Sequence, residues 1–202
     1  MYSRFLATTG RAWVLTGLLA VASGLAGAAT TSTKFEPTTQ LQGTPLQLNG
    51  AGTRYKVVFK VYDMALYTPK KVGSPEELLA LSGPKRLSFV ALREIPGTDL
   101  GVAFIKGLQA NSTKEQMQKN AVSTTRLIEI FSGQPKLAQG DTFAMDFVPG
   151  VGTTFYIAGK AQGAPVGDAE FFGMVLKIWV GTSPADFKLK DALLGQDTLA
   201  AR

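Results

Sequence analysis

Leu48-Asn49-Gly50-Ala51-Gly52-Thr53-Arg54-Tyr55 is a glycine-rich turn that leads into a strand rich in Val, Phe and Tyr. Gly50 and Gly52 have no Cβ, so the chain can turn sharply there and approach another strand or a ligand closely. The pattern predicts one long strand from Arg54 to Tyr67, with Arg54 held at its start. The planar Arg54 guanidinium offers five donors, which suits a fixed anion or carbonyl group. A solvated surface arginine is the alternative.

Alternation along this strand predicts which side chains share a face of the sheet. Apolar residues first occupy every second position, at Tyr55, Val57, Phe59 and Val61, and then the phase shifts to Met64 and Leu66. A slip of one residue predicts a β-bulge at Tyr62-Asp63-Met64 that re-aims the side chains. With this bulge we expect Tyr62 and Tyr67 to flank the same interior space as Arg54. Half-buried packing within the strand is the alternative for both tyrosines.

The rest of the chain predicts a mixture of helices and antiparallel strands. Ser74-Pro75 begins a short helix, with Ser as the N-cap and Pro at the first helical position. Further helices are expected at 98–108, 113–131, 168–180 and 188–194, and strands at 85–94, 141–148 and 153–159. The last two strands are joined by a hairpin signal, Pro149-Gly150-Val151-Gly152. Because regular βαβ alternation is missing, the pattern favours an α+β domain.

The N-terminal residues have the pattern of a secretory signal peptide. Arg4 and Arg11 precede an apolar run from Ala12 to Ala22, and small residues follow up to Ala28-Ala29. The apolar run is too short to span a bilayer comfortably. We therefore expect a signal peptide over residues 1–28, a tether over 29–45, and one domain over 46–197. A periplasmic or secreted protein without a membrane span follows, with an uncleaved signal anchor as the alternative.

The composition excludes several classes of chemistry. The chain has no cysteine and no histidine, which excludes disulfides, thiol nucleophiles, a Ser-His-Asp triad and sites built on these ligands. Without the signal peptide, 19 basic residues stand against 15 acidic ones, and they are interleaved, unlike those of a nucleic-acid binder. EF-hand and P-loop spacings are also missing. We expect no cofactor, no metal and no nucleic-acid partner, and this shortage of catalytic groups favours a binding role.

Several motifs together resemble the chalcone isomerase fold family, and its exported bacterial chalcone isomerase-like branch in particular. They are Gly50-Ala51-Gly52-Thr53-Arg54, the strand ending Ala65-Leu66-Tyr67, the helix from Phe171 to Val180 with Gly181 and Ser183-Pro184 after it, and Leu189-Lys190-Asp191-Ala192-Leu193-Leu194-Gly195. The resemblance covers about Leu46 to Gly195. It implies an open-faced β-sandwich, a large antiparallel sheet packed against a layer of helices, with a ligand cleft between them.

The resemblance also implies roles for particular residues. Arg54 matches the arginine that orients the substrate for cyclisation in the plant enzymes and helps to hold a carboxylate in the fatty-acid-binding members. Tyr62 falls near the plant threonine that positions a water, and Phe172 near the Ser or Thr of the last large helix. Lys106 is the one comparable group on the helix that carries other plant catalytic residues, and it is off register. An anion anchor without the polar network favours binding over cyclisation.

Two functions from different classes therefore stay open. The first is a periplasmic protein that binds a fatty acid or another small apolar carboxylate or phenolate. Its candidate ligand-binding residues are Arg54, Tyr62, Tyr67, Lys106, Phe172 and Val175. The second is an isomerase or intramolecular lyase that acts on a chalcone-like or other enone substrate, with Arg54 polarising a carbonyl and a tyrosine or Lys106 moving a proton. A third alternative is a partner protein with a filled core, in which Arg54 is buried against Asp or Glu.

Overall fold

Seven antiparallel strands form the main sheet of the computed structural model, which describes residues 31–196. In order across the sheet they are β1 (Thr38–Leu41), β2 (Thr44–Lys56), β3 (Phe59–Thr68), β4 (Lys85–Ala91), β7 (Thr142–Val148), β8 (Gly152–Ile157) and β9 (Lys160–Ala161). A separate pair consists of β5 (Ile95–Pro96) and β6 (Lys136–Leu137). The expected signal peptide lies outside the described residues.

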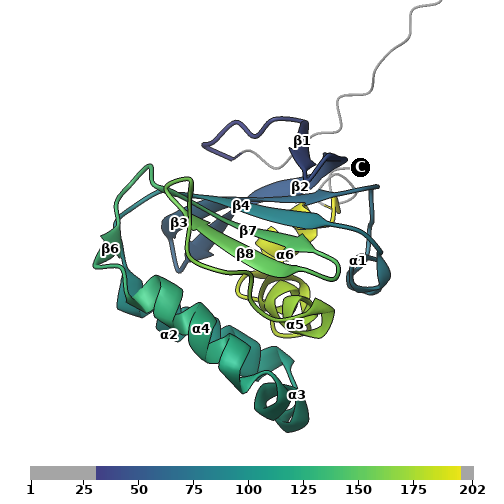
Figure 1. Ribbon diagram of the computed structural model, residues 1–202. Helices are drawn as coiled ribbons and strands as arrows, with labels where there is room; N and C mark the ends of the chain where they lie inside the picture. The colour runs from purple at the N-terminus through teal and green to yellow at the C-terminus, as the bar shows by residue number, and fades with distance from the viewer. Residues whose placement is uncertain (1–30, 197–202) are drawn as a thin grey trace, which may run out of the picture.

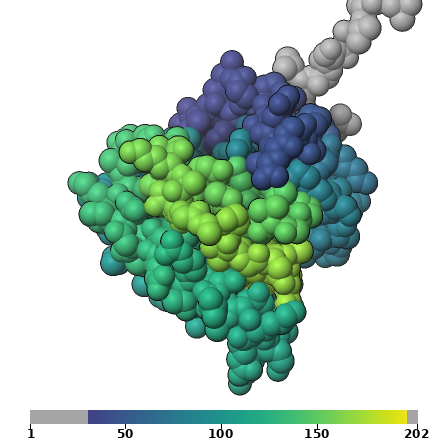
Figure 2. Space-filling view, viewed as in Figure 1, coloured from purple at the N-terminus to yellow at the C-terminus, as the bar shows by residue number. Residues whose placement is uncertain are grey.

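Helices cover one side of this sheet. They are α1 (Pro75–Ala80), α2 (Gly97–Asn111), α3 (Lys114–Lys119), α4 (Ala121–Ser132), α5 (Ala169–Val180) and α6 (Phe187–Leu193). α2, α4 and α5 lie below the sheet, and the N-terminal segment with β1 lies above it (Figure 1). The space-filling view shows this N-terminal segment in purple as the upper surface and the helices in teal projecting below (Figure 2). The predicted α+β class, an antiparallel sheet against a layer of helices, is confirmed.

The strand predicted from Arg54 to Tyr67 is in fact parts of two strands. β2 and β3 form a hairpin that turns at Val57 and Val58, so Arg54 lies near the end of β2 instead of at the start of a strand. The sequence shows no Gly, Asn or Asp at this turn, and therefore no turn signal. The expected tether also differs, because residues 38–41 form β1 and pair with β2.

The predicted slip in register lies one residue earlier than expected. Arg54 pairs with Tyr62 and Tyr55 pairs with Lys60, so Val61 is the extra residue in β3. A second irregularity leaves Asn49 as the extra residue of β2. From Tyr62 onward β3 pairs with β4 without interruption, and its side chains alternate regularly between the two faces of the sheet.

Aromatic side chains fill the space between the sheet and the helices. Phe89 and Phe143 stack with their ring centroids 4.1 Å apart, and Trp179 of α5 lies 5.2 Å from Phe89. Phe104 of α2 and Phe131 of α4 extend the cluster, at 4.8 Å from each other. All five are almost fully buried. This aromatic core fixes α5 and α2 against the middle of the sheet.

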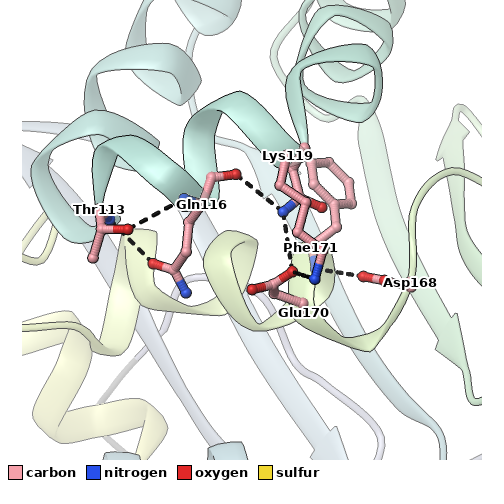
Figure 3. A network of polar contacts seen from close by, with 7 residues as sticks. Thr113, Gln116, Lys119, Asp168, Glu170 and Phe171 are labelled. Atoms are coloured by element: carbon pink, nitrogen blue, oxygen red, sulfur yellow. Dashed lines mark hydrogen bonds and ion pairs between the residues drawn. The ribbon is translucent and has the colours of Figure 1, made fainter.

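The N-terminus of α5 is fixed by polar contacts with α3 (Figure 3). The Asp168 side chain caps α5, because its Oδ1 accepts a hydrogen bond of 3.0 Å from the Phe171 backbone N–H. Glu170 forms an ion pair with Lys119 at 2.5 Å and accepts a longer bond from Asn120. Asn120 also interrupts the single helix predicted over 113–131, since it ends α3 and precedes α4.

The turn predicted at Gly50 and Gly52 is wrong, because both glycines lie within β2. Their lack of a Cβ instead lets α6 lie directly against this strand. A Cβ on Gly50 would stand 2.1 Å from the Ala192 carbonyl oxygen and 2.6 Å from that of Leu193. A Cβ on Gly52 would stand 2.7 Å from the Ala192 side chain. The close approach expected of these glycines is therefore an approach to a helix, and it brings the C-terminal end of the chain onto the strand that carries Arg54.

We expect Gly50→Ala to destabilise the protein, because the new methyl group would meet backbone atoms of α6 that cannot move aside. Overpacking of this kind costs about 2 to 3 kcal/mol. Urea unfolding followed by circular dichroism measures the loss. Gly73→Ala is the matched control, since the nearest atom to its Cβ would be 4.0 Å away. Equal stability of Gly50→Ala and the wild type would show that α6 does not pack on β2 as described.

Candidate functional site

The candidate site lies at one end of the space between sheet and helices, where Arg54 and Tyr62 face each other. The two residues are direct partners across the β2–β3 hairpin. Tyr62 is 6% exposed, and its hydroxyl oxygen accepts a hydrogen bond of 2.8 Å from the Trp179 indole N–H. Arg54 is half-buried beside it. Three donor-bearing side chains from β2, β3 and α5 therefore meet at one point.

Groups of both charges act on the Tyr62 hydroxyl. Burial raises its pKa most, the charge of Arg54 and hydrogen bonds from Trp179 and Arg54 lower it, and the negative charge of Asp186 raises it. Tyr62 therefore keeps its proton at neutral pH. Within residues 31–196 its O–H donates to no protein acceptor, so this proton is available to a ligand.

Arg54 has no acidic partner within the described part of the chain. Its guanidinium donates to the backbone carbonyl of Tyr55, and no carboxylate lies within 4.0 Å. The nearest acid by connectivity is Asp186, whose two oxygens accept hydrogen bonds from the backbone N–H groups of Tyr55, Lys188 and Leu189. The ion pair of Arg54 with Asp or Glu, which the alternative of a partner protein with a filled core implied, is therefore not present within residues 31–196.

Two hollows lie away from Arg54, near α1. The first, of about 320 Å³, is lined by apolar side chains of α1, β7 and α5, including Leu79, Phe147, Phe172 and Leu176. Phe172 stacks on Phe147 there, with the ring centroids 4.6 Å apart. Since Phe143, four residues earlier on β7, contacts Tyr62, this cavity lies roughly 13 Å along the strand from the Arg54 site. The second hollow, of about 760 Å³, lies between α1 and the loop after β3.

Tyr67, another predicted site residue, lies away from Arg54 and Tyr62. Tyr67 lies on the opposite face of the sheet, because an uninterrupted strand turns residues 62 and 67 to opposite sides. It packs with Leu41, Leu46 and Ala65, and its hydroxyl donates to the Glu36 carbonyl at 2.9 Å. The expectation that Tyr67 flanks the same space as Arg54 is therefore wrong.

Lys106 and Val175 occupy contrasting positions on two helices. Lys106 is exposed on the outer side of α2, whereas Phe104 and Leu108 of the same helix are buried. Val175 is fully buried on α5, between Phe172 and Trp179 on the helix surface that faces the sheet. Phe172, Val175 and Trp179 thus form one apolar stripe that leads from the cavity to the Arg54 site.

The sequence did not predict two polar groups of this region, the Trp179 indole N–H and the Lys85 ammonium group. The sequence suggests no role for Trp179 beyond its place in the helix expected at 168–180, although its spacing of seven from Phe172 puts both side chains on one face of that helix. Lys85 is 4% exposed at the wall of the smaller cavity, where its ammonium group donates to the Leu81 and Gly83 carbonyls and lies 5.7 Å from the Phe147 ring. Burial lowers the pKa of Lys85.

Within residues 31–196, no group of three or more acidic, histidine or cysteine side chains is arranged to hold a metal ion. None of the helices in this part of the chain is both long and apolar enough to cross a bilayer.

Comparisons with known proteins define the class to which this fold belongs. The profile of the chalcone isomerase-like family matches residues 27–195. This protein belongs to the chalcone isomerase-like family. A solved structure of an Arabidopsis thaliana fatty-acid binding protein is similar, with a TM-score of 0.61, 14% identity, and coverage of 83% of this chain and 94% of that one. Among curated proteins, none matches this sequence.

We expect the stability of the protein to fall at alkaline pH, partly through Tyr62. Because the folded pKa of Tyr62 lies above the unfolded value of 10.0, its contribution is full below that pH and is lost as pH rises through the folded pKa. The fall in the free energy of unfolding between about pH 9 and about pH 11 should be smaller in Tyr62→Phe than in the wild type, measured by urea unfolding. Tyr55→Phe, at an exposed tyrosine, is the control and should follow the wild type. Equal slopes in all three proteins would contradict the buried, protonated state of Tyr62.

Proposed function

We propose that this protein is exported and binds a small apolar carboxylate or phenolate of the fatty-acid type, with Arg54 and Tyr62 at the polar end of the ligand. Export is supported by the signal-peptide pattern of residues 1–28. Binding is supported by membership of the family and by the similar structure, whose own protein is a fatty-acid binding protein.

The observation that carries the proposal is an arginine without an acidic partner beside a buried hydroxyl that keeps its proton. Arg54 supplies a positive charge, and the Tyr62 O–H supplies a second donor a short distance away. A carboxylate accepts from both at once, and charge-assisted bonds of this kind are the strong ones. The Trp179 N–H holds the Tyr62 oxygen from the other side, which leaves the hydroxyl proton to point at the ligand.

The apolar part of the ligand needs a path, and the inner surface of α5 offers one. Phe172, Val175 and Trp179 face the sheet along roughly 10 Å of helix. Phe172 lines the existing cavity, and Trp179 borders the Arg54 site. A chain bound along this stripe would separate α5 from Phe89, whose ring now lies 5.2 Å from that of Trp179. We therefore propose Phe172 and Val175 as walls of the ligand site, opened when the ligand enters.

The same geometry makes proton-transfer catalysis the weaker candidate. An isomerase needs a group that accepts a proton at neutral pH, whereas burial raises the pKa of Tyr62 and so keeps it a donor. Lys106, the other group considered for this role, is exposed on α2. The Arg54–Tyr62 pair is better suited to hold an anion than to move a proton.

We expect Arg54→Gln to bind palmitate roughly 10- to 100-fold more weakly than the wild type, because it loses the charge but keeps a polar, shorter side chain. Isothermal titration calorimetry measures this, and native mass spectrometry of the protein from its own cells identifies any ligand that copurifies.

The matched control is Arg126→Gln, which removes a charge from the exposed surface of α4, where Arg126 pairs with Glu129. It should bind palmitate as the wild type does. Equal affinity of Arg54→Gln and the wild type would contradict the role of Arg54. A wild type that carries no ligand from cells and takes up neither palmitate nor a phenolate would contradict the binding function itself.

A further inference from the structure

The tip of the β2–β3 hairpin exposes three consecutive apolar side chains. Val57 is 90% exposed, Val58 75% and Phe59 61%. Phe187 is 66% exposed and follows Asp186, which accepts a hydrogen bond of 2.9 Å from the Tyr55 backbone N–H. Phe187 therefore lies at the same end of the molecule. Single exposed apolar residues are ordinary on a protein surface, but a contiguous group of them indicates a contact surface.

The backbone of this tip is strained as well as apolar. Val57 has a φ of +59°, in the left-handed region that β-branched residues avoid. Two-residue hairpin turns normally place Gly, Asn or Asp at such a position. A valine there is strained, and its side chain, 90% exposed, contributes almost no burial in return. Neither the turn geometry nor the stability of the fold explains Val57-Val58.

Basic side chains surround the apolar tip. Lys56 pairs with Phe59 and Lys60 pairs with Tyr55, so a lysine flanks the turn on each strand. The Arg93 guanidinium lies over the Phe59 ring, 5.8 Å from its centroid. All three cations are exposed. Glu94, the acid next to Arg93, is already paired with Lys136 at 2.6 Å.

We propose that this tip, Lys56 to Lys60 with Arg93, docks the protein onto an anionic lipid bilayer. Val57, Val58 and Phe59 enter the interface, and the three cations contact the lipid phosphates around them. Binding at a membrane surface grows with the apolar area buried and with attraction to anionic lipids, and the tip supplies both. Long basic side chains can keep their charges at headgroup level while their stems lie on apolar surface. A protein partner would need a broader apolar surface than three residues of one turn.

The tip lies next to the candidate ligand site. Along the hairpin, the pair Lys56 and Phe59 is followed by Tyr55 and Lys60, and then by Arg54 and Tyr62. Arg54 is thus within roughly 10 Å of the tip. When the protein is bound to a bilayer, the Arg54 site would lie at the depth of the lipid headgroups, where the carboxylates of fatty acids also lie. This purpose of docking rests on the proposed function, whereas docking itself can be measured without a ligand.

The test measures cosedimentation of the protein with vesicles of phosphatidylglycerol and phosphatidylethanolamine, and with vesicles of phosphatidylcholine alone. The protein is used in the form that its cells accumulate, with the N-terminus determined by intact mass. We expect the wild type to prefer the anionic vesicles and to lose this preference at high salt. Lys56→Ser with Lys60→Ser should weaken binding to anionic vesicles about fivefold for each lysine removed.

Two further variants test insertion of the apolar tip. Val58→Ser with Phe59→Ser should weaken vesicle binding at least about tenfold, whereas Val122→Ser, at a side chain 86% exposed on α4, should leave it unchanged. Phe59→Trp should be quenched by brominated lipid chains only when anionic vesicles are present. Wild-type protein that ignores both kinds of vesicle, or a Trp at position 59 that stays unquenched in vesicle-bound protein, would overturn the proposal.

Val57→Gly separates docking from a structural role. Glycine adopts a φ of +59° without strain, so this variant should unfold at a higher temperature than the wild type and yet bind anionic vesicles more weakly. A variant that gains stability and keeps full vesicle binding would contradict a role for Val57 in docking.

The proposed ligand site and the proposed docking surface can be tested independently of each other. Arg54→Gln should bind palmitate more weakly and keep most of its vesicle binding, whereas Val58→Ser with Phe59→Ser should bind palmitate in solution as the wild type does. If the wild type takes up palmitate but never binds vesicles, the docking proposal fails and the proposed function stands. If it binds vesicles but takes up no ligand, the reverse holds.

Discussion

The register of the β2–β3 hairpin determines that Arg54 and Tyr62 meet. Arg54 shares the face of β2 on which Gly50 and Gly52 contact α6, and a shift of one residue in β3 would turn Tyr62 to the other face. The extra residue Val61 turns the β3 side chains at this point, and Tyr62 then joins the aromatic core. The hydrogen bond from Trp179 ties this pair to α5. The candidate site therefore depends on one strand pairing.

A buried asparagine holds the other end of the same hairpin. Asn49, the extra residue of β2, donates to the Val72 and Leu193 carbonyls at 3.0 and 2.7 Å and accepts from the Val72 N–H at 2.8 Å. It thus joins β2 to the loop after β3 and to the end of α6. Gly50 follows at once, where the lack of a Cβ admits the α6 backbone. These polar and steric constraints together fix the position of β2 against β3 and α6. They therefore also fix the position of Arg54, which lies on the same strand.

Most features that depend on residues close in sequence were predicted correctly, whereas contacts between residues far apart in sequence were not. Caps such as Ser74 and Asp168 act within three residues, so their chemistry is visible in the sequence and the helices they begin were predicted. The hairpin was missed because Val57-Val58 contradicts turn chemistry. Tyr67 was misplaced because the bulge lies at Val61, and one residue decides the face. The link between Trp179 and Tyr62 spans 117 positions, and no local pattern encodes it.

The packed core and the proposed ligand site are compatible if the ligand takes the place of α5 side chains against the sheet. Trp179, Phe89 and Phe143 now occupy the space beside Tyr62. An apolar chain that replaced their mutual contacts would exchange one buried apolar surface for another, so the hydrophobic cost of opening is small once the ligand is in place. In the proposed complex the ligand would add a carboxylate for Arg54, which forms no ion pair within residues 31–196. We therefore expect this carboxylate, more than the size of any preformed cavity, to decide which molecules the site favours.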